Sequence, residues 1–223
     1  MILAYLPQLL SGLSITLILL FSAIGAGLVL ALSLVVCDYS DHFLVKKLIA
    51  SLIFFIRGTP LLVQIFLIYY GLGQLTWVRS SFLWFFLREP MVCAIIALSI
   101  NTACYTAVII KGAIASVPRN EIDACYAIGM SKWLTLRRIV LPRAFRIMLP
   151  AYSNEVLMIL KSTSLASTIT LLEIMGVTQQ LIAETYDTVK FYLIAAVIYL
   201  LLNMVITSIF MMLRKNLVLP NNA

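Results

Sequence analysis

Charged residues are scarce in this chain of 223 residues: they make up 11% of it, against 63% hydrophobic residues. Soluble domains contain about a quarter charged residues and about half apolar residues. Monomeric soluble proteins also avoid large exposed apolar patches, so a soluble domain could not accommodate this surplus. The composition therefore predicts an integral membrane protein.

Sequence patterns typical of enzymes and metalloproteins are also missing. No two of the four cysteines form a C-x-x-C pair, and we interpret them as reduced, apolar side chains. The single histidine, His42, has no plausible metal-binding or nucleophilic partner, so no metal site, cofactor or catalytic residue is predicted. A G-x4-G-K-[ST] phosphate loop is absent, so any ATP hydrolysis must belong to another chain.

Long apolar stretches fill most of the chain. A helix needs roughly 20 apolar residues to cross the hydrocarbon core of a bilayer. Stretches of that length predict an all-α membrane protein with about five transmembrane helices, the first of which is too long and too poor in charge for a cleaved signal peptide. These stretches are 9–37, 48–72, 91–110, 148–172 and 191–213.

The basic residues predict the orientation of these helices, because Lys and Arg concentrate on the cytoplasmic side of a membrane. Eleven of the 16 lie in 38–47, in 111–147 and in the C-terminal tail, whereas three lie on the opposite face. The N-terminus is therefore expected outside and the C-terminus inside. The formal net charge of +7 does not indicate nucleic-acid binding, because the basic residues form no stripe interleaved with aromatic side chains.

Three charged residues lie inside predicted spans: Arg57 in the second, and Glu155 and Lys161 in the fourth. Lys161 can snorkel or bond carbonyl groups, so Arg57 and Glu155 are the informative ones. A charge near the centre of a membrane is unfavourable by roughly 2.5–3.5 kcal/mol on insertion scales, so each should have a partner or a wet environment. Gly58 and Pro60 favour a break in the second span, which is tolerated where the backbone faces protein or water. The two segments are thus expected to line a polar cavity. The alternative is that Arg57 and Glu155 pair directly with each other or lie near the membrane interface.

The longest hydrophilic segment, 111–141, lies on the predicted cytoplasmic face and has the pattern of ordered structure. Gly129 follows a helix-forming run and suits a helix C-terminus, while Pro142 suits the start of a helix. The segment therefore predicts a short helix, a break, and a second helix that enters the membrane.

The spacing of this segment is similar to Glu-Ala-Ala-x3-Gly-x9-Ile-x-Leu-Pro, the signature loop of bacterial ABC importer permeases. Asp and Cys replace the family's Glu and second Ala. The resemblance implies a single transmembrane domain, 1–223, whose coupling loop at about 113–142 docks on an ATPase subunit. The candidate coupling residues are Asp123, Ala124, Gly129, Ile139, Leu141 and Pro142.

Segments 57–64 and 151–165 resemble the polar amino-acid branch of that family, of the histidine/arginine type. The resemblance implies a type I ABC importer permease in the bacterial inner membrane, in contact with lipid. Its implied partners are ABC ATPase subunits, a second permease chain and a periplasmic amino-acid-binding protein. The implied cargo is a basic amino acid such as arginine. Which basic amino acid is preferred, and whether the two permease chains are identical, stay open.

The candidate substrate-binding residues are Glu155, Asn154, Gly58 and Thr59. A carboxylate suits the guanidinium or ammonium group of a basic amino acid. The competing hypothesis is a proton-coupled secondary transporter in which Glu155 binds the proton. The odd number of spans, the lack of an internal repeat and the signature loop argue against it. A membrane enzyme is a third hypothesis, which the single histidine does not favour.

Overall fold

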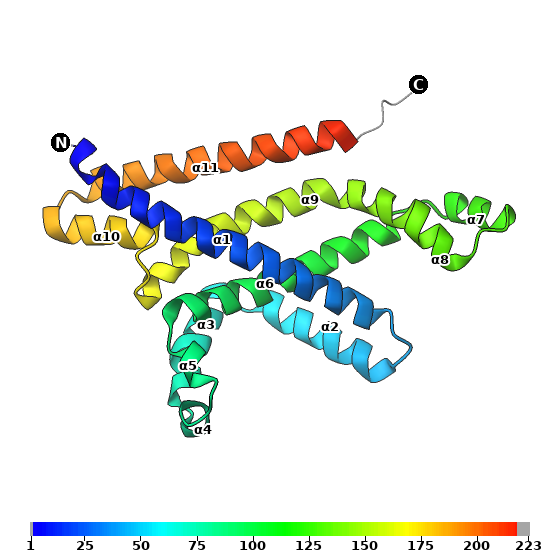
Figure 1. The fold of residues 1–223 in the computed structure, drawn as a ribbon, viewed down its shortest axis with the longest axis horizontal. Helices are drawn as coiled ribbons and strands as arrows, with labels where there is room; N and C mark the ends of the chain where they lie inside the picture. Colours follow the sequence, from blue (N-terminus) through cyan, green and yellow to red (C-terminus); the bar gives the residue numbers. More distant parts are fainter. Residues whose placement is uncertain (1, 218–223) are drawn as a thin grey trace.

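The computed structural model describes residues 2–217, which form helices and short connections without a strand. The long helices cross one another, with α1 running obliquely to α6 and α9, and shorter helices project from the bundle (Figure 1). The α-helices are α1 (Ile2–Asp38), α2 (Phe43–Gly58), α3 (Leu61–Phe66), α4 (Thr76–Arg79), α5 (Trp84–Leu87), α6 (Pro90–Ala115), α7 (Arg119–Ala127), α8 (Lys132–Thr135), α9 (Leu141–Ser162), α10 (Ile174–Thr185) and α11 (Thr188–Leu217). Wide π-helical turns cover Leu67–Gly71 and Leu136–Val140, and 3-10 turns cover Leu72–Gln74 and Thr163–Ile169.

The prediction of about five spans is confirmed, but two of the five are bent. Helices α1, α6 and α11 are each long and apolar enough to cross a membrane alone. The second predicted span, 48–72, is broken between α2 and α3, with a bend of 106°. The fourth predicted span, 148–172, continues through a 3-10 turn into α10, with a bend of 48° between the two parts.

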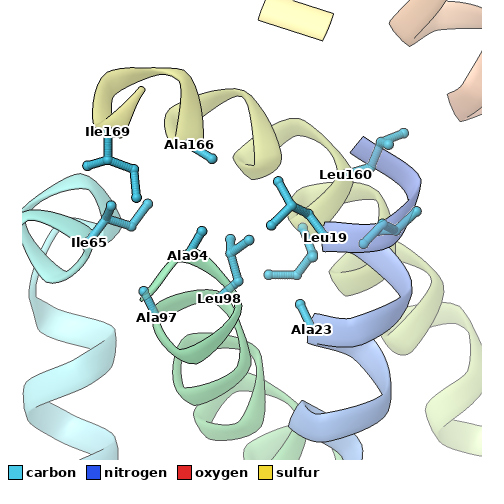
Figure 2. Packing of buried hydrophobic residues seen from close by; sticks show 11 residues of the cluster. Leu19, Ala23, Ile65, Ala94, Ala97, Leu98, Leu160, Ala166 and Ile169 are labelled. Atoms are coloured by element: carbon cyan, nitrogen blue, oxygen red, sulfur yellow. The ribbon is translucent and has the colours of Figure 1, made fainter. Parts of the chain in front are cut away.

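The central packing layer joins α1, α3, α6 and α9. Alanines and leucines from these helices interdigitate with the 3-10 turn that follows α9 (Figure 2). Small side chains allow helix backbones to approach closely, which favours helix association in a membrane. The buried residues of this layer are Leu19, Leu20, Ala23, Ile65, Ala94, Ala97, Leu98, Ile159, Leu160, Ala166 and Ile169.

The crossing of α1 and α6 depends on Gly27. A Cβ atom added there would lie 2.2 Å from the Thr102 side chain and 3.2 Å from the Ser99 carbonyl oxygen. A side chain there would have to displace Thr102 and press on the backbone of α6, so a glycine lets the two helices touch. This contact fixes α6 at the centre of the bundle, where it can meet both broken spans.

Helix α10 is fixed by a buried carboxylate, Glu173, at its N-terminus. Glu173 accepts hydrogen bonds from the backbone N–H of Gly176 (2.9 Å) and from the Tyr199 hydroxyl on α11 (2.8 Å). The adjacent Ile174 N–H donates to the Thr16 hydroxyl on α1 (3.2 Å). The start of α10 is therefore tied to both the first and the last long helix.

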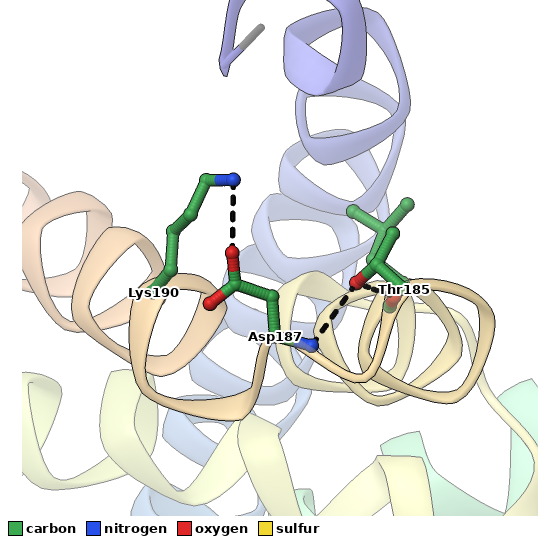
Figure 3. Close-up of polar contacts among 4 residues, drawn as sticks. Thr185, Asp187 and Lys190 are labelled. Atoms are coloured by element: carbon green, nitrogen blue, oxygen red, sulfur yellow. Dashed lines mark hydrogen bonds and ion pairs between the residues drawn. The ribbon is translucent and has the colours of Figure 1, made fainter.

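The connection from α10 to α11 is short and polar (Figure 3). Tyr186 ends α10 with a left-handed backbone (φ 60°). Asp187 then donates its N–H to the Thr185 hydroxyl (3.4 Å) and pairs its carboxylate with Lys190 (3.1 Å). These contacts let the chain reverse direction within a few residues.

The arrangement agrees with the predicted orientation. The N-terminal end and α10 lie at one end of the bundle, while the α1–α2 connection, α7, α8 and the end of α11 lie toward the other (Figure 1). The second group contains the segments that carry most of the basic residues.

The orientation can be tested with single cysteines in a Cys37→Ser background, since Cys37 is exposed. We expect Ser80→Cys to react with an impermeant maleimide added to whole cells, because Ser80 is exposed on the predicted outer face. The exposed His42→Cys is the matched control and should react only in inverted membrane vesicles. The reverse pattern would invert the assignment of the two faces.

Candidate functional site

The break between α2 and α3 follows from Pro60. A proline disfavours helical geometry at the residue before it, and Thr59 is accordingly extended (φ −111°, ψ 145°). Helix α2 therefore ends at Gly58, and α3 starts at Leu61. The Thr59 hydroxyl donates to the Phe55 carbonyl oxygen (3.0 Å), which satisfies one of the acceptors that the ended helix leaves.

Gln64 holds the two sides of this break together. Its side-chain amide nitrogen lies 2.7 Å from the Ile56 carbonyl oxygen, 3.1 Å from that of Thr59 and 2.9 Å from the Thr59 hydroxyl. Its amide oxygen accepts a hydrogen bond from Asn101 on α6 (3.1 Å). Backbone groups at membrane depth need internal partners, and Gln64, which is only 7% exposed, supplies them.

We expect Gln64→Leu to destabilise the protein by roughly 1–3 kcal/mol, because it leaves the partly buried carbonyl groups of Ile56 and Thr59 without this donor. Thermal unfolding of the purified complex in detergent would measure the change. The matched control is Gln180→Leu, since Gln180 is exposed and its side chain bonds to Glu184 on the surface of α10. Equal melting temperatures for the two variants would contradict this role of Gln64.

Glu155 faces the same region from α9 and is 8% exposed. The Thr102 hydroxyl on α6 lies near its carboxylate, and the Arg57 guanidinium attracts it through space. Among the described residues, however, no salt bridge within 4.0 Å includes Glu155 or Arg57. The alternative of a direct Arg57–Glu155 ion pair is therefore not the arrangement of this structure.

A cavity of about 430 Å³ lies between the broken second span, α6 and α9. Its volume falls in the range of small-molecule sites, which combine apolar walls with a few convergent polar groups. Among the described residues that line it, Glu155 is the one with a formal charge. The polar lining residues are Thr59, Asn101, Tyr105, Asn154, Glu155 and Ser162.

The cavity brings together three of the four predicted substrate-binding residues. Thr59, Asn154 and Glu155 line it, whereas Gly58 belongs to the end of α2 and is not among the lining residues. Sequence reasoning did not assign Asn101 to the site. Asn101 and Tyr105 are polar residues four positions apart, which places them on the same face of an apolar helix. This spacing could have indicated a polar site on that face.

The predicted coupling residues occupy two consecutive helical parts. Asp123 and Ala124 are exposed on α7, and Gly129 follows with φ +84°. Ile139 lies in the π-helical turn, and Leu141 and Pro142 are in the first turn of α9. A salt bridge from Arg143 to Glu121 (2.9 Å) links the two parts.

The predicted break at Gly129 is confirmed, and Pro142 lies in the first turn of α9, as its sequence position predicted. The helical path, however, already begins at Lys132, and the Ser131 hydroxyl caps it by accepting from the Leu134 N–H (3.3 Å). Pro142 is tolerated inside the path because the π-helical turn before it widens the backbone. Around the break, Ile128 is 78% exposed and Trp133 is 66% exposed, an apolar surface suited to a protein contact.

Comparison with known proteins gives matches along most of the chain. Residues 23–218 match the family described as binding-protein-dependent transport system inner membrane component. The octopine transport system permease protein OccM of Rhizobium radiobacter is 48% identical over 206 residues, which cover 92% of this chain and 84% of OccM. The arginine ABC transporter permease protein ArtM of Escherichia coli K12 is 48% identical over 169 residues, 75% of each chain. A solved amino acid ABC transporter with histidines has a chain 29% identical, with a TM-score of 0.87 and 96% of each chain covered.

Proposed function

Because this chain belongs to the family of inner membrane components of binding-protein-dependent transport systems, we propose that it is the permease subunit of an ATP-driven importer of basic amino acids. Two of its relatives are named for the transport of arginine and octopine. The chain carries no phosphate loop, so ATP hydrolysis is assigned to partner ABC subunits.

The observation that carries this proposal is the single carboxylate in the cavity. Glu155 has no cation within 4.0 Å among the described residues, and its cavity neighbours are neutral. An arginine side chain in the cavity would supply that cation and donate two parallel hydrogen bonds to the carboxylate. We place the substrate's polar backbone groups near Asn154 and Thr59 rather than near Gly58, because Thr59 and Asn154 line the cavity.

The proposed transport cycle uses the broken span and the cytoplasmic segment together. A periplasmic amino-acid-binding protein delivers the substrate to a pair of permease chains, and the cavity opens alternately to the two faces of the membrane. We assign the coupling loop to about 113–142, where α7 and the exposed residues around Gly129 would dock on the ATPase. The link from Arg143 to Glu121 would transmit movement of α7 to α9, which carries Glu155.

Reconstitution tests this function directly. Proteoliposomes with the permease pair and its ATPase are supplied with the periplasmic binding protein and labelled arginine. We expect uptake that requires ATP, persists with a proton uncoupler, and is lost with an ATPase variant unable to hydrolyse ATP. Uptake driven by a pH gradient without ATP would instead support the proton-coupled hypothesis, in which the buried Glu155 binds the proton.

A further inference from the structure

Arg57 lies beside an aromatic ring instead of beside the nearby carboxylate. Its guanidinium carbon is 4.9 Å from the centroid of the Tyr105 ring on α6. The Tyr105 hydroxyl in turn lies 3.5 Å from the Arg57 carbonyl oxygen. A cation over an aromatic face is attracted by the negative charge density of the ring. Tyr105 therefore contacts both the side chain and the backbone of the last turn of α2.

The position of Arg57 is unexpected because Glu155 carries the opposite charge. Arg57 is exposed at the end of α2, and its long side chain contains several rotatable bonds. A guanidinium and a carboxylate form the strongest side-chain pair available here, with two parallel hydrogen bonds. Another contact must keep the Arg57 guanidinium away from the Glu155 carboxylate. The structure provides one, with the Tyr105 ring.

The chemical identity of Arg57 gives this restraint a functional meaning. Its side chain presents the same guanidinium group as the proposed cargo, so an Arg57 paired with Glu155 would occupy the group that recognises the substrate. We propose that Tyr105 keeps Arg57 away from Glu155, which makes Tyr105 a positioning residue and Arg57 a built-in competitor for the substrate site. This inference rests on the proposed function of Glu155.

The arrangement also explains how an unpaired carboxylate is tolerated in the membrane. A positive charge at a distance lowers the free-energy cost of burying a carboxylate. It does so without occupying the hydrogen-bonding positions of the carboxylate oxygens. Arg57 acts in this way while it stays on Tyr105. The carboxylate oxygens of Glu155 thus stay open to a ligand.

Direct binding measures the effect without the periplasmic protein. Labelled arginine is titrated into the assembled complex of permease and ATPase subunits in detergent. We expect Tyr105→Leu to weaken arginine binding by roughly tenfold. The substitution removes the cation–π contact, so the energy that kept Arg57 on the ring no longer opposes the Arg57–Glu155 pair. Tyr105→Phe keeps the aromatic face and should lose far less.

The double variant separates competition from simple damage to the cavity. In Arg57→Gln/Tyr105→Leu the competitor is gone, so affinity should return to that of Arg57→Gln alone. A purely structural role of Tyr105 predicts no such rescue, and its absence would overturn the inference. If Tyr105→Leu fails to assemble, pentafluorophenylalanine at position 105 keeps the ring size but removes its negative face, and the same rescue is required.

A ligand-free measurement distinguishes failure of this inference from failure of the proposed cargo. Melting temperatures of Arg57→Gln, Glu155→Gln and the double variant, each compared with the parent protein, form a double-mutant cycle. The cycle gives the interaction energy between Arg57 and Glu155, called the coupling here. We expect weak coupling with Tyr105 present and clearly stronger coupling in the Tyr105→Leu background. Equal coupling in both backgrounds would overturn the inference even if arginine binds. Stronger coupling without any arginine binding would uphold it and reject the proposed cargo.

Discussion

Replacing Gly129 with aspartate is expected to abolish coupled transport while the chain still inserts in the membrane. Gly129 ends α7 with two characteristic hydrogen bonds, from its own N–H to the Tyr126 carbonyl and from the Met130 N–H to the Cys125 carbonyl (both 3.0 Å). A Cβ atom there meets no other atom within 4 Å. The folding cost of a side chain therefore comes from the backbone, with φ at +84°, and amounts to roughly 1–2 kcal/mol.

The larger effect of this substitution comes from charge in the proposed docking surface. Ile128 and Trp133 next to the break are strongly exposed, and we propose that the ATPase covers them. An uncompensated charge buried in such a contact costs roughly 3–5 kcal/mol, which exceeds a hundredfold change in an equilibrium constant. We expect substrate-stimulated ATP hydrolysis and uptake in proteoliposomes to fall by at least tenfold.

The matched control for this prediction is Gly129→Asn. Asparagine has nearly the same shape as aspartate and tolerates left-handed backbone geometry, but it carries no charge. It should keep most of the coupled activity. Equal losses in both variants would assign the effect to the backbone, and normal coupling in Gly129→Asp would contradict an ATPase contact at this break.

The parts of this structure that sequence reasoning predicted are the ones that local chemistry determines. A lipid environment requires helices, so apolar length alone located the spans. Pro60 marked the break in the second span, and Gly129 marked the end of α7. Glu155 was conspicuous because a carboxylate inside an apolar segment needs a functional or structural reason.

What could not be predicted depends on contacts between distant residues. Gln64 meets Asn101 across 37 positions, and the Ile174 N–H meets Thr16 across 158. The bend of 106° at Thr59 is set by such packing, since Pro60 fixes where the helix ends but not where the next one points. Glu173, at the edge of a predicted span, is fully buried because Tyr199 on a separate helix reaches it.

Replacing Glu155 with glutamine is expected to reduce arginine uptake by at least tenfold without loss of assembly. Glutamine keeps the size and hydrogen-bonding reach of the side chain but removes its charge. At about 4 Å and an effective dielectric constant near 20, the lost attraction is on the order of 4 kcal/mol before desolvation is deducted. Part of that attraction is offset by desolvation of both groups, so tenfold is a lower bound on the effect.

The matched control for this change is Glu184→Gln, the same substitution at an exposed position on α10, where the carboxylate bonds to Gln180 (3.1 Å). Uptake of labelled arginine and of a neutral amino acid such as glutamine should be measured in parallel with the same binding protein. We expect Glu155→Gln to lower the ratio of arginine to glutamine uptake, and Glu184→Gln to leave it unchanged.

The two possible failures of this prediction have different meanings for the site. A Glu155→Gln variant that assembles and transports arginine normally would show that the cargo is recognised elsewhere, and the 430 Å³ cavity would then need another ligand. A variant that does not assemble would make Glu155 a structural group rather than a substrate-binding one. Loss of arginine transport in an assembled complex, with unchanged basal ATP hydrolysis and a lowered ratio of arginine to glutamine uptake, is the result that a substrate-binding carboxylate requires. A defect in coupling would lower the uptake of both amino acids alike.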